Sequence, residues 1–459
     1  MGLFDALDAG ELTTLRVLNA GDGNVSLSAS RTFEPDWNFG DYGRRYAVDQ
    51  IPCPSARCLS DPETRTFFQQ SGASAALEAL LAGMRRQHHE MVWLCSHAKL
   101  QIRVAHFIHS SSLGLRQPQH ALRAGGIRRY APDTNEDSAL ATGLNLSRAM
   151  SYKCAQAELP YGGSKTALFS AAIEKDDDAR LGFLAYCIDR GHLMTGPDVG
   201  LSGELIDALS TRYTPNILCG ASTPMGSTGA PTAEGIFIAI RAAAAFLWDS
   251  SKLEGRSAVL QGLGSVGLAL LERLATAGMR VSAYDPDPAR VQLALTAVPS
   301  LTVLPPENLL TTECDLFAPC AMGAVIGHAQ VPQLNCKLIY GAANNTLDAN
   351  SIEDEIVLAK ALAARGILTQ PDWSITVGGV IAGHEERTHA GLSSVKRVHA
   401  ALARICGAKT TELLATAAER KITPTELAYE RVHARLSAAT ASWSQSAPRL
   451  SPGRGSVPT

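Results

Sequence analysis

Two lysines near the middle of the first half of the chain have residue types and spacing that suit chemistry. Lys153 and Lys165 lie in the segment YKCAQAELPYGGSK, where apolar residues and a glycine pair separate them. A lysine can anchor a carboxylate, and a second lysine that is desolvated beside another cation has a lowered pKa and can act as a base at neutral pH. Gly162 and Gly163 would let the backbone crowd a reacting centre. Taken alone, each lysine has an equally good explanation without chemistry: its aliphatic stem is buried and its ammonium group reaches water.

A second motif with a chemical use is the glycine-rich turn QGLGSVG. Gly262, Gly264 and Gly267 have the spacing of a dinucleotide-binding turn. The first glycine would allow a tight turn, the second a close approach of the backbone to a pyrophosphate, and the third close packing of a helix on a strand. Ser265 and Val266 would begin that helix, whose free amide groups face the anion. We expect a bound dinucleotide here; a glycine-rich turn without a ligand is the alternative.

An acidic residue follows at the position where the adenosine ribose of a dinucleotide would lie. Asp285 ends the strand expected over residues 280–285, directly after the helix that the glycine-rich turn opens. Its carboxylate would accept hydrogen bonds from the ribose hydroxyl groups and would repel a 2′-phosphate. The predicted cofactor is therefore NAD rather than NADP.

The elements that must position these residues follow an alternating pattern of strands and helices. Short apolar runs between turn residues predict strands, and apolar residues at helical spacing predict helices. The expected strands are 102–109, 257–262, 280–285, 314–320, 337–342 and 365–370, and the expected helices are 74–86, 136–157, 181–190, 231–248 and 266–277. Residues before 74 read as irregular, with one possible strand within DGNVSLSASRTF. The alternation is typical of an α/β fold with a parallel sheet.

Composition narrows the class of protein further. The chain has 459 residues, of which 46% are apolar and 19% charged, with a formal net charge of -3. This charge gives no reason to expect nucleic acid or an anionic membrane as a partner. No run of eighteen apolar residues occurs, and the stretch Ala242–Trp248 is too short to span a bilayer. The N-terminus lacks the features of a signal peptide, and ten dispersed cysteines indicate reduced thiols. We expect a cytoplasmic protein without a bound metal.

Several of these motifs together resemble a known family. The chain resembles the glutamate/leucine/phenylalanine/valine dehydrogenases in the order and spacing of AGGIRRY, AMSYKCAQAELPYGGSK, GPDVG, GSTGAPTAEG, QGLGSVG, DLFAPCAMGAVI and GAANNTL. The resemblance extends from about Met91 to Gly383, and the leucine and phenylalanine enzymes are the most similar members. It implies NAD-dependent, reversible oxidative deamination of an L-amino acid to a 2-oxo acid and ammonia, in a homo-oligomer.

The resemblance also implies a role for each matching residue. Lys153 matches the lysine that binds the substrate α-carboxylate, Lys165 the catalytic lysine, and Asp198 the aspartate that handles the amino group and assists proton transfer. Hydride leaves the α-carbon to give an iminium ion, Lys165 helps water to add, and ammonia departs. The other matching residues line the substrate (Ala124, Gly125, Gly126) or the cofactor (Thr232, Cys320, Ala321, Asn344).

The chain departs from the family pattern at several positions. Ala124 stands where glutamate-specific members carry a lysine, so an apolar substrate, branched or aromatic, is expected. Thr376 replaces an asparagine that precedes the glycine pair of ITVGGVIAG. The loop RQPQHALR is longer than its counterpart in the leucine enzymes and is expected to shape the mouth of the pocket. An extra segment, residues 1–85, precedes the usual start of the family; oligomer contacts and a cover for the site are the two roles left open.

These observations predict a two-domain α/β protein: an N-terminal α/β substrate domain and a doubly wound Rossmann NAD-binding domain. The expected division is 1–85 for the extra segment, 86–228 for the substrate domain, 229–379 for the NAD-binding domain, 380–440 for C-terminal helices that pack on the substrate domain, and 441–459 for a disordered tail. Two rival functions stay open: an oxidoreductase of specialised metabolism acting on an unusual amino acid, and a non-catalytic NAD-binding protein of the same fold.

Overall fold

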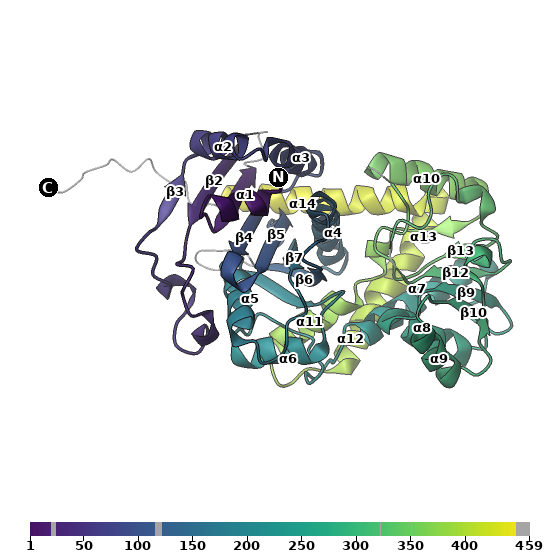
Figure 1. Cartoon of the computed structure of the whole chain (residues 1–459). Coiled ribbons are helices and arrows are strands. Elements are labelled where there is room, and N and C mark those ends of the chain that lie inside the picture. Colours follow the sequence, from purple (N-terminus) through teal and green to yellow (C-terminus); the bar gives the residue numbers. More distant parts are fainter. Residues whose placement is uncertain (20–23, 115–121, 322, 350, 447–459) are drawn as a thin grey trace.

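Two sheets organise the chain, each in its own lobe (Figure 1). A computed structural model of the protein describes residues 1–19, 24–114, 122–321, 323–349 and 351–446. The loop RQPQHALR therefore falls largely outside the described residues.

The first lobe is built on a mixed sheet of eight strands in the order β3-β2-β1-β4-β5-β7-β6-β8. Strand β6 runs parallel to both of its neighbours, β7 and β8, and the remaining pairs are antiparallel. The strands are β1 Thr14–Asn19, β2 Val25–Arg31, β3 Arg57–Leu59, β4 Met91–His97, β5 Ile102–Ser110, β6 Arg123–Tyr130, β7 Gly162–Phe169 and β8 Leu193–Pro197. Strand β7 is buried along its whole length, so the lysine that it carries lies inside the lobe.

The first 85 residues belong to this sheet, and the expectation that most of them are irregular was wrong. Strand β1 pairs with β4, and β2 and β3 continue the sheet outward. Phe4 packs edge-on against Phe169 with 5.6 Å between ring centroids, and Phe68 shares one apolar cluster with Phe107. The possible strand within DGNVSLSASRTF is confirmed as β2, although its sequence, VSLSASR, has few large apolar residues and so gives a weak strand pattern.

Helices cover both faces of this sheet (Figure 1). They are α1 Leu3–Ala9, α2 Asp61–Gln70, α3 Ser74–Arg86, α4 Glu136–Gln156, α5 Asp178–Arg190 and α6 Gly203–Arg212. The three helices predicted in this region, 74–86, 136–157 and 181–190, are confirmed as α3, α4 and α5, although α5 begins earlier than predicted. Helix α4 packs along β5 and β7, with Gly143 placed where a side chain would strike the ring of Phe107.

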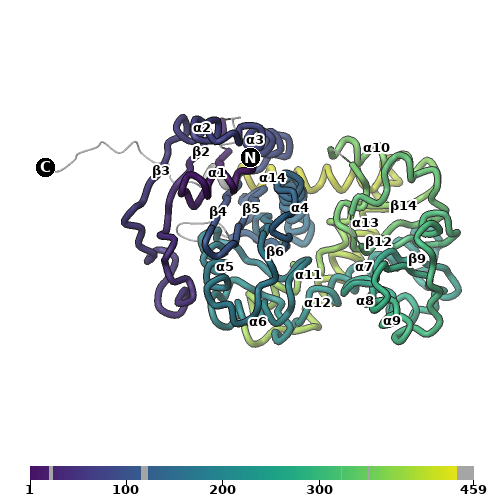
Figure 2. The backbone as a smooth tube through the Cα atoms, viewed as in Figure 1, coloured from purple at the N-terminus to yellow at the C-terminus, as the bar shows by residue number. Residues whose placement is uncertain are grey.

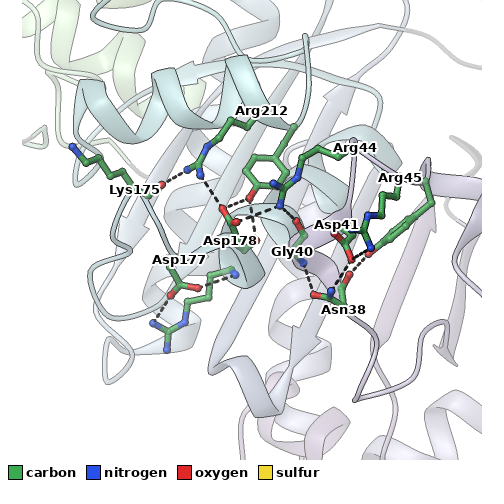
Figure 3. A network of polar contacts seen from close by, with 12 residues as sticks. Asn38, Gly40, Asp41, Arg44, Arg45, Lys175, Asp177, Asp178 and Arg212 are labelled. Carbon is green, nitrogen blue, oxygen red and sulfur yellow. Dashed lines mark hydrogen bonds and ion pairs between the residues drawn. The ribbon is translucent and has the colours of Figure 1, made fainter.

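A polar network ties the loop after β2 to the start of α5 (Figure 3). The Asp178 carboxylate accepts hydrogen bonds from Tyr213 Oη at 2.6 Å, Arg212 Nη1 at 2.8 Å and Arg44 Nη2 at 3.2 Å. The hydroxyl of Tyr213, together with the two guanidinium groups, lowers the pKa of Asp178. Arg44 also donates to the carbonyl of Gly40, so the loop is held by both backbone and side-chain contacts.

The second lobe contains a parallel sheet of six strands in the order β11-β10-β9-β12-β13-β14. This is the order of a doubly wound dinucleotide-binding sheet, in which the sequence order of the strands reverses between β9 and β12 while the strands stay parallel. The strands are β9 Ser257–Gln261, β10 Arg280–Tyr284, β11 Thr302–Val303, β12 Leu316–Pro319, β13 Leu338–Ile339 and β14 Leu368–Thr369, with helices α8 Ser265–Thr276, α9 Pro288–Ala297 and α10 Ile352–Ala364. All the strands predicted in this region are confirmed, several of them shorter than predicted.

Helix α7, Gly229–Trp248, connects the two lobes. It begins before Pro231, which lies in the first turn, where a missing amide proton costs no helical hydrogen bond. The stretch Ala242–Trp248 is part of this longer helix, so the argument that it is too short for a membrane was wrong: by length and composition alone α7 could cross one. Its apolar composition is accounted for by packing, because α7 contacts α8 and the helices that follow β14.

The C-terminal helices divide between two partners. They are α11 Gly378–Thr388, α12 Val395–Leu402, the π-helical turn η7 Ala403–Ala408, α13 Lys409–Arg420 and α14 Pro424–Ser446. The first four pack on α7, whereas α14 contacts α4 and α10 and so reaches from one lobe to the other (Figures 1 and 2). A capping box opens α14: Thr423 N donates to Glu426 Oε2 at 2.8 Å, and Glu426 N donates to Thr423 Oγ1 at 3.2 Å. Residues 441–446 of the predicted tail are helical, and 447–459 lie outside the described residues.

The shared apolar cluster predicts that the N-terminal residues stabilise the first lobe. Phe68 is fully buried in α2, and its replacement in Phe68→Ala removes a ring from the same cluster as Phe107. We expect the free energy of unfolding to fall by about 3–5 kcal/mol, measured by urea denaturation. Phe67→Ala, which truncates a half-buried neighbouring ring, should cost clearly less. Equally small changes in the free energy of unfolding for both variants would mean that the first 85 residues do not contribute to the stability of the lobe.

Candidate active site

A cavity of about 210 Å³ lies where the two lobes meet, and it collects residues from both. The following residues, all predicted for the site from the sequence, line it: Ala124, Gly125, Gly126, Lys153, Lys165, Asp198, Thr232, Val266 and Asn344. Strand β6 lies between its parallel neighbours β7 and β8, and the pairing of Ala124 with Gly163 and of Gly126 with Gly196 brings Lys165 and Asp198 together, whereas Lys153 comes from α4.

Two glycines of β6 are required by the close approach of this strand to its neighbours. A Cβ at Gly125 would lie 2.0 Å from the carbonyl oxygen of Ser164. A Cβ at Gly126 would lie 3.2 Å from Cβ of Asp198 and 3.3 Å from Nζ of Lys165. The absence of a side chain at Gly126 thus creates the space in which Lys165 and Asp198 meet.

Lys165 and Asp198 form a buried ion pair. Lys165 Nζ donates to Asp198 Oδ2 at 2.5 Å, and only 6% of Lys165 is exposed. Burial lowers the pKa of Lys165 from its usual value, and the neighbouring Asp198 opposes this shift. Burial alone would raise the pKa of Asp198, but the positive charges of Lys165 and Arg128 hold it at about 2. The pair therefore combines a permanent carboxylate with an amine that gives up its proton more easily than a solvated lysine.

The second lysine faces the same cavity from α4. Lys153 Nζ donates to Asn344 Oδ1 at 2.9 Å, across the gap between the lobes. Burial lowers the pKa of Lys153; the buried Asp372 opposes this effect, and Lys165 adds to it. Asp372, in the short turn η6 Asp372–Ser374, is a residue that the sequence reading missed, because an isolated aspartate has no pattern.

Arg128 is a second site residue that sequence reasoning overlooked. Its Nε lies 3.4 Å from Asp198 Oδ2, and its side chain is 14% exposed. The residue stands within AGGIRRY, one of the motifs that carried the family resemblance, so the signal was present without an assigned role.

The rest of the cavity wall is mostly apolar, and most of it could not be found from the sequence. It consists of Leu146, Ala149, Met150, Met194, Leu218, Cys219, Val380 and Gly383, among others. Cys219 has a left-handed backbone, with φ of 60°, and its amide donates to Oε2 of Glu386 at 2.7 Å. Glu386 also accepts from Met225 N at 3.0 Å, so this carboxylate of α11 fixes the loop that supplies Leu218 and Cys219.

The glycine-rich turn lies beside this cavity, and only Val266 of the turn lines it. Gly262 has a φ of 96°, which favours glycine, and a Cβ there would lie 2.8 Å from Cβ of Ala321. A Cβ at Gly267 would lie 2.1 Å from the carbonyl oxygen of Gly262. A Cβ at Gly264, by contrast, would have no neighbour nearer than 3.8 Å. The N-terminus of α8, with Ser265 as its first residue, has no capping side chain, so its amide groups are available to an anion.

The residues near the expected ribose site have more partners than the sequence indicated. Asp285 follows β10, and its carboxylate accepts from Leu263 N at 2.7 Å and from Asp287 N at 2.9 Å. Arg290 Nη1 lies 3.7 Å from the same carboxylate. Cys320, after β12, donates its amide proton to the carbonyl of Gln261 at 2.7 Å. Asp285 therefore shapes the glycine-rich turn directly.

Two threonines join the second lobe to α11. Thr232 accepts from Gly379 N at 3.1 Å and donates to the carbonyl of Thr228 at 2.7 Å. Thr376, which replaces the family asparagine, donates to the carbonyl of Asp372 at 2.8 Å and lines the cavity. Its hydroxyl proton is therefore engaged by the backbone. Among the described residues, no group of three or more His, Cys, Asp or Glu side chains could hold a metal ion.

Comparisons with known proteins agree with this architecture. Residues 289–443 match the family model described as Glutamate/Leucine/Phenylalanine/Valine dehydrogenase, and residues 116–214 match the model of the dimerisation domain of these enzymes. The chain is 32% identical to the L-tryptophan dehydrogenase of Nostoc punctiforme over 67% of its own length and 83% of that protein. It is 36% identical to the valine dehydrogenase of Streptomyces virginiae over 65% of its length and 81% of that protein.

A solved structure of an amino-acid dehydrogenase has the same fold. The crystal structure of the L-tryptophan dehydrogenase from Nostoc punctiforme superposes with a TM-score of 0.60 at 28% identity, covering 78% of this chain and 99% of that one. Fold and cavity define a two-domain oxidoreductase with a dinucleotide-binding sheet. The chain belongs to the glutamate/leucine/phenylalanine/valine dehydrogenase family: it is an amino-acid dehydrogenase that acts on CH–NH₂ groups with a nicotinamide cofactor.

The glycines of the cavity provide a matched pair of variants. Gly126→Ala would place a methyl group against Lys165 and Asp198, and we expect kcat to fall by about 100-fold with little change in Tm. Gly383→Ala adds a methyl group that meets only Cys219 Sγ at 3.8 Å and Leu218 Cδ1 at 3.9 Å, so it should alter substrate preference without abolishing turnover. If Gly126→Ala turns over at the wild-type rate, a methyl group at this position does not disturb the contact between Lys165 and Asp198.

Proposed function

We propose that the protein catalyses the NAD-dependent, reversible oxidative deamination of an apolar L-amino acid, branched or aromatic, to a 2-oxo acid and ammonia. One observation carries this proposal: Lys153, Lys165 and Asp198 converge on a cavity whose remaining wall is mostly apolar. The three charged groups suit the α-carboxylate and the reacting amino group, which every amino acid has. The apolar wall then selects the side chain.

The residues act in a defined order in this proposal. Lys153 anchors the α-carboxylate, which takes the place of Asn344 as the partner of the ammonium group. Asp198 accepts a hydrogen bond from the substrate amino group and holds the α-carbon in one orientation. Lys165, as the neutral amine, takes a proton from the water that adds to the oxidised α-carbon and returns it as ammonia leaves. The overall reaction consumes one water molecule and releases one proton with each two-electron oxidation.

The cofactor assignment follows from the glycine-rich turn. When bound, the nicotinamide cofactor accepts the hydride from the α-carbon of the amino acid. The open backbone at Gly264 and the uncapped amide groups of α8 fit a pyrophosphate. The buried carboxylate of Asp285 and its neighbour Asp287 disfavour a 2′-phosphate beside the turn, although Arg290 partly balances their charge. We propose NAD as the physiological cofactor.

The side-chain preference follows from the cavity wall. Ala124 is buried and lines the cavity without a charge to pair with a side-chain carboxylate, which disfavours glutamate. A Cβ at Gly383 would have no neighbour within 3.7 Å, so the cavity extends toward α11. Relatives at comparable identity act on tryptophan, valine, phenylalanine and leucine. Large apolar side chains are the class that this space suits.

The remaining assignments belong to the same proposal. In this proposal residues 86–228 form the substrate domain together with the strands of residues 1–85, and residues 229–379 form the NAD-binding domain. The helices of residues 380–440, expected to pack on the substrate domain, instead contact α7 and, through α14, both α4 and α10. We propose that the enzyme works in the cytoplasm as a homo-oligomer. Its partners are the amino acid or 2-oxo acid and ammonia.

A panel assay tests the function directly. We expect NADH absorbance to rise when the protein is mixed at about pH 10 with NAD⁺ and leucine, phenylalanine or tryptophan, because an alkaline solution favours the neutral amine of Lys165. NADP⁺ and glutamate should give much weaker signals. Lys165→Ala should lose turnover while retaining NADH binding, measured by fluorescence titration.

Two outcomes would contradict the proposal. If no standard amino acid is oxidised by a protein that binds NADH, the cavity serves an unusual amino acid or no reaction. If Lys165→Ala remains active, the base is another group.

A further inference from the structure

Three strands bring two cations to one carboxylate oxygen. Arg128 lies two residues after Gly126 on β6, so both residues face the same side of the sheet. Asp198 Oδ2 accepts from Lys165 Nζ at 2.5 Å and pairs with Arg128 Nε at 3.4 Å. Arg128 therefore contacts the same carboxylate oxygen as Lys165.

The two cations differ in one property that matters for the reaction. Lys165 must lose its proton to act as a base, and Asp198 then loses the charge of its nearest partner. A guanidinium group stays charged at every pH at which proteins function. Arg128 is thus the one partner of Asp198 among the described residues whose charge is present in every step.

We propose that Arg128 is a positioning residue of the reaction: it keeps the Asp198 carboxylate ionised and in place while Lys165 releases and regains its proton, and its charge favours the neutral form of Lys165. The proposal rests on the function proposed above. It assigns a role to a residue that is not among those lining the cavity.

The charges around the pair agree with this role. The positive charge of Arg128 lowers the pKa of Lys165, after the larger effect of burial, and it helps to lower the pKa of Asp198. The other titratable groups near these residues are Lys153 on α4, whose own neighbour is Asp372 in η6, and Tyr130 on β6. The pKa of Tyr130 is raised by burial, so this phenol is neutral near pH 7 and adds no charge. Removing Arg128 should therefore raise the pKa of Lys165, because a like charge disappears and Asp198 then has Lys165 as its remaining partner.

The test compares neutral and charged replacements. Arg128→Gln and Arg128→Met remove the charge, and Arg128→Lys keeps it. Arg123→Gln is the matched control: Arg123 is half-buried on the same strand, but it donates to Ser111 Oγ and the carbonyl of Gly191 instead of Asp198. For each variant, kcat/KM of amino-acid oxidation is measured from about pH 6 to about pH 11.

We expect the rising limb of the pH profile to move up by about one pH unit in the two neutral variants, with about ten-fold lower activity at neutral pH that recovers as the pH rises. Arg128→Lys should restore most of the wild-type profile, and Arg123→Gln should leave the position of the limb unchanged. A profile that falls equally at every pH would overturn the proposal. Failure of both neutral variants to fold would assign Arg128 to the architecture of the sheet and would also overturn it.

A second measurement separates this proposal from the proposed function. The pH dependence of acetylation at Lys165, read by mass spectrometry after brief exposure to acetic anhydride, reports the ionisation of this amine without any turnover. A shift to higher pH in Arg128→Gln supports the role of Arg128 even if no substrate is found. Equal titration curves for wild type and variant contradict it even if the enzyme is active.

Discussion

The buried ion pair between Lys165 and Asp198 is the interaction on which the rest of the site depends. Two opposite charges inside a protein are stable only when their geometry is good, and removing one partner of such a pair typically costs about 3–5 kcal/mol. The strand order meets this requirement, because β6 lies between the strand that carries Lys165 and the strand that precedes Asp198. Gly126 then supplies the space between the two side chains. Gly126 and the strand order β7-β6-β8 together allow Lys165 and Asp198 to form their ion pair.

The second lobe adds the other half of the reaction. The order of its parallel strands reverses beside the glycine-rich turn, and a nucleotide bound there would lie next to the cavity. Lys153 already contacts Asn344 across the gap, and Glu386 of α11 fixes the loop that supplies Cys219. Helices α7, α11 and α14 link the lobes, so closure of the cavity around a substrate would be a movement of packed helices rather than of a free loop.

Much of this could be predicted from the sequence, for identifiable physical reasons. Most strands of the second lobe, with α7 and α8, have clear apolar patterns, and the glycine-rich turn has a spacing with few other uses; β11, α9 and α10 were not predicted. Lys153, Lys165 and Asp198 were found because they lie in motifs with a distinctive order. The structure brings them to one cavity, as expected.

The rest depends on contacts between distant parts of the chain. In the first lobe only β5 was expected, and β2, which has few large apolar residues, was offered only as a possible strand; the other six strands of this sheet were not predicted. Leu218 and Cys219 come from a loop without a motif, and Asp372 approaches Lys153 only after folding. Arg128 was visible within AGGIRRY, yet its partner could be known only from the pairing of β6 with β8.

A crystal structure with the nicotinamide cofactor and the 2-oxo acid of the preferred substrate tests the central claim most directly. The account predicts a carboxylate oxygen of the acid at about 3 Å from Lys153 Nζ and the 2-oxo oxygen within hydrogen-bond distance of Lys165 Nζ. The apolar side chain should then lie against Leu218 and Val380. A complex in which the carboxylate binds elsewhere, with Lys153 still paired to Asn344, would contradict it.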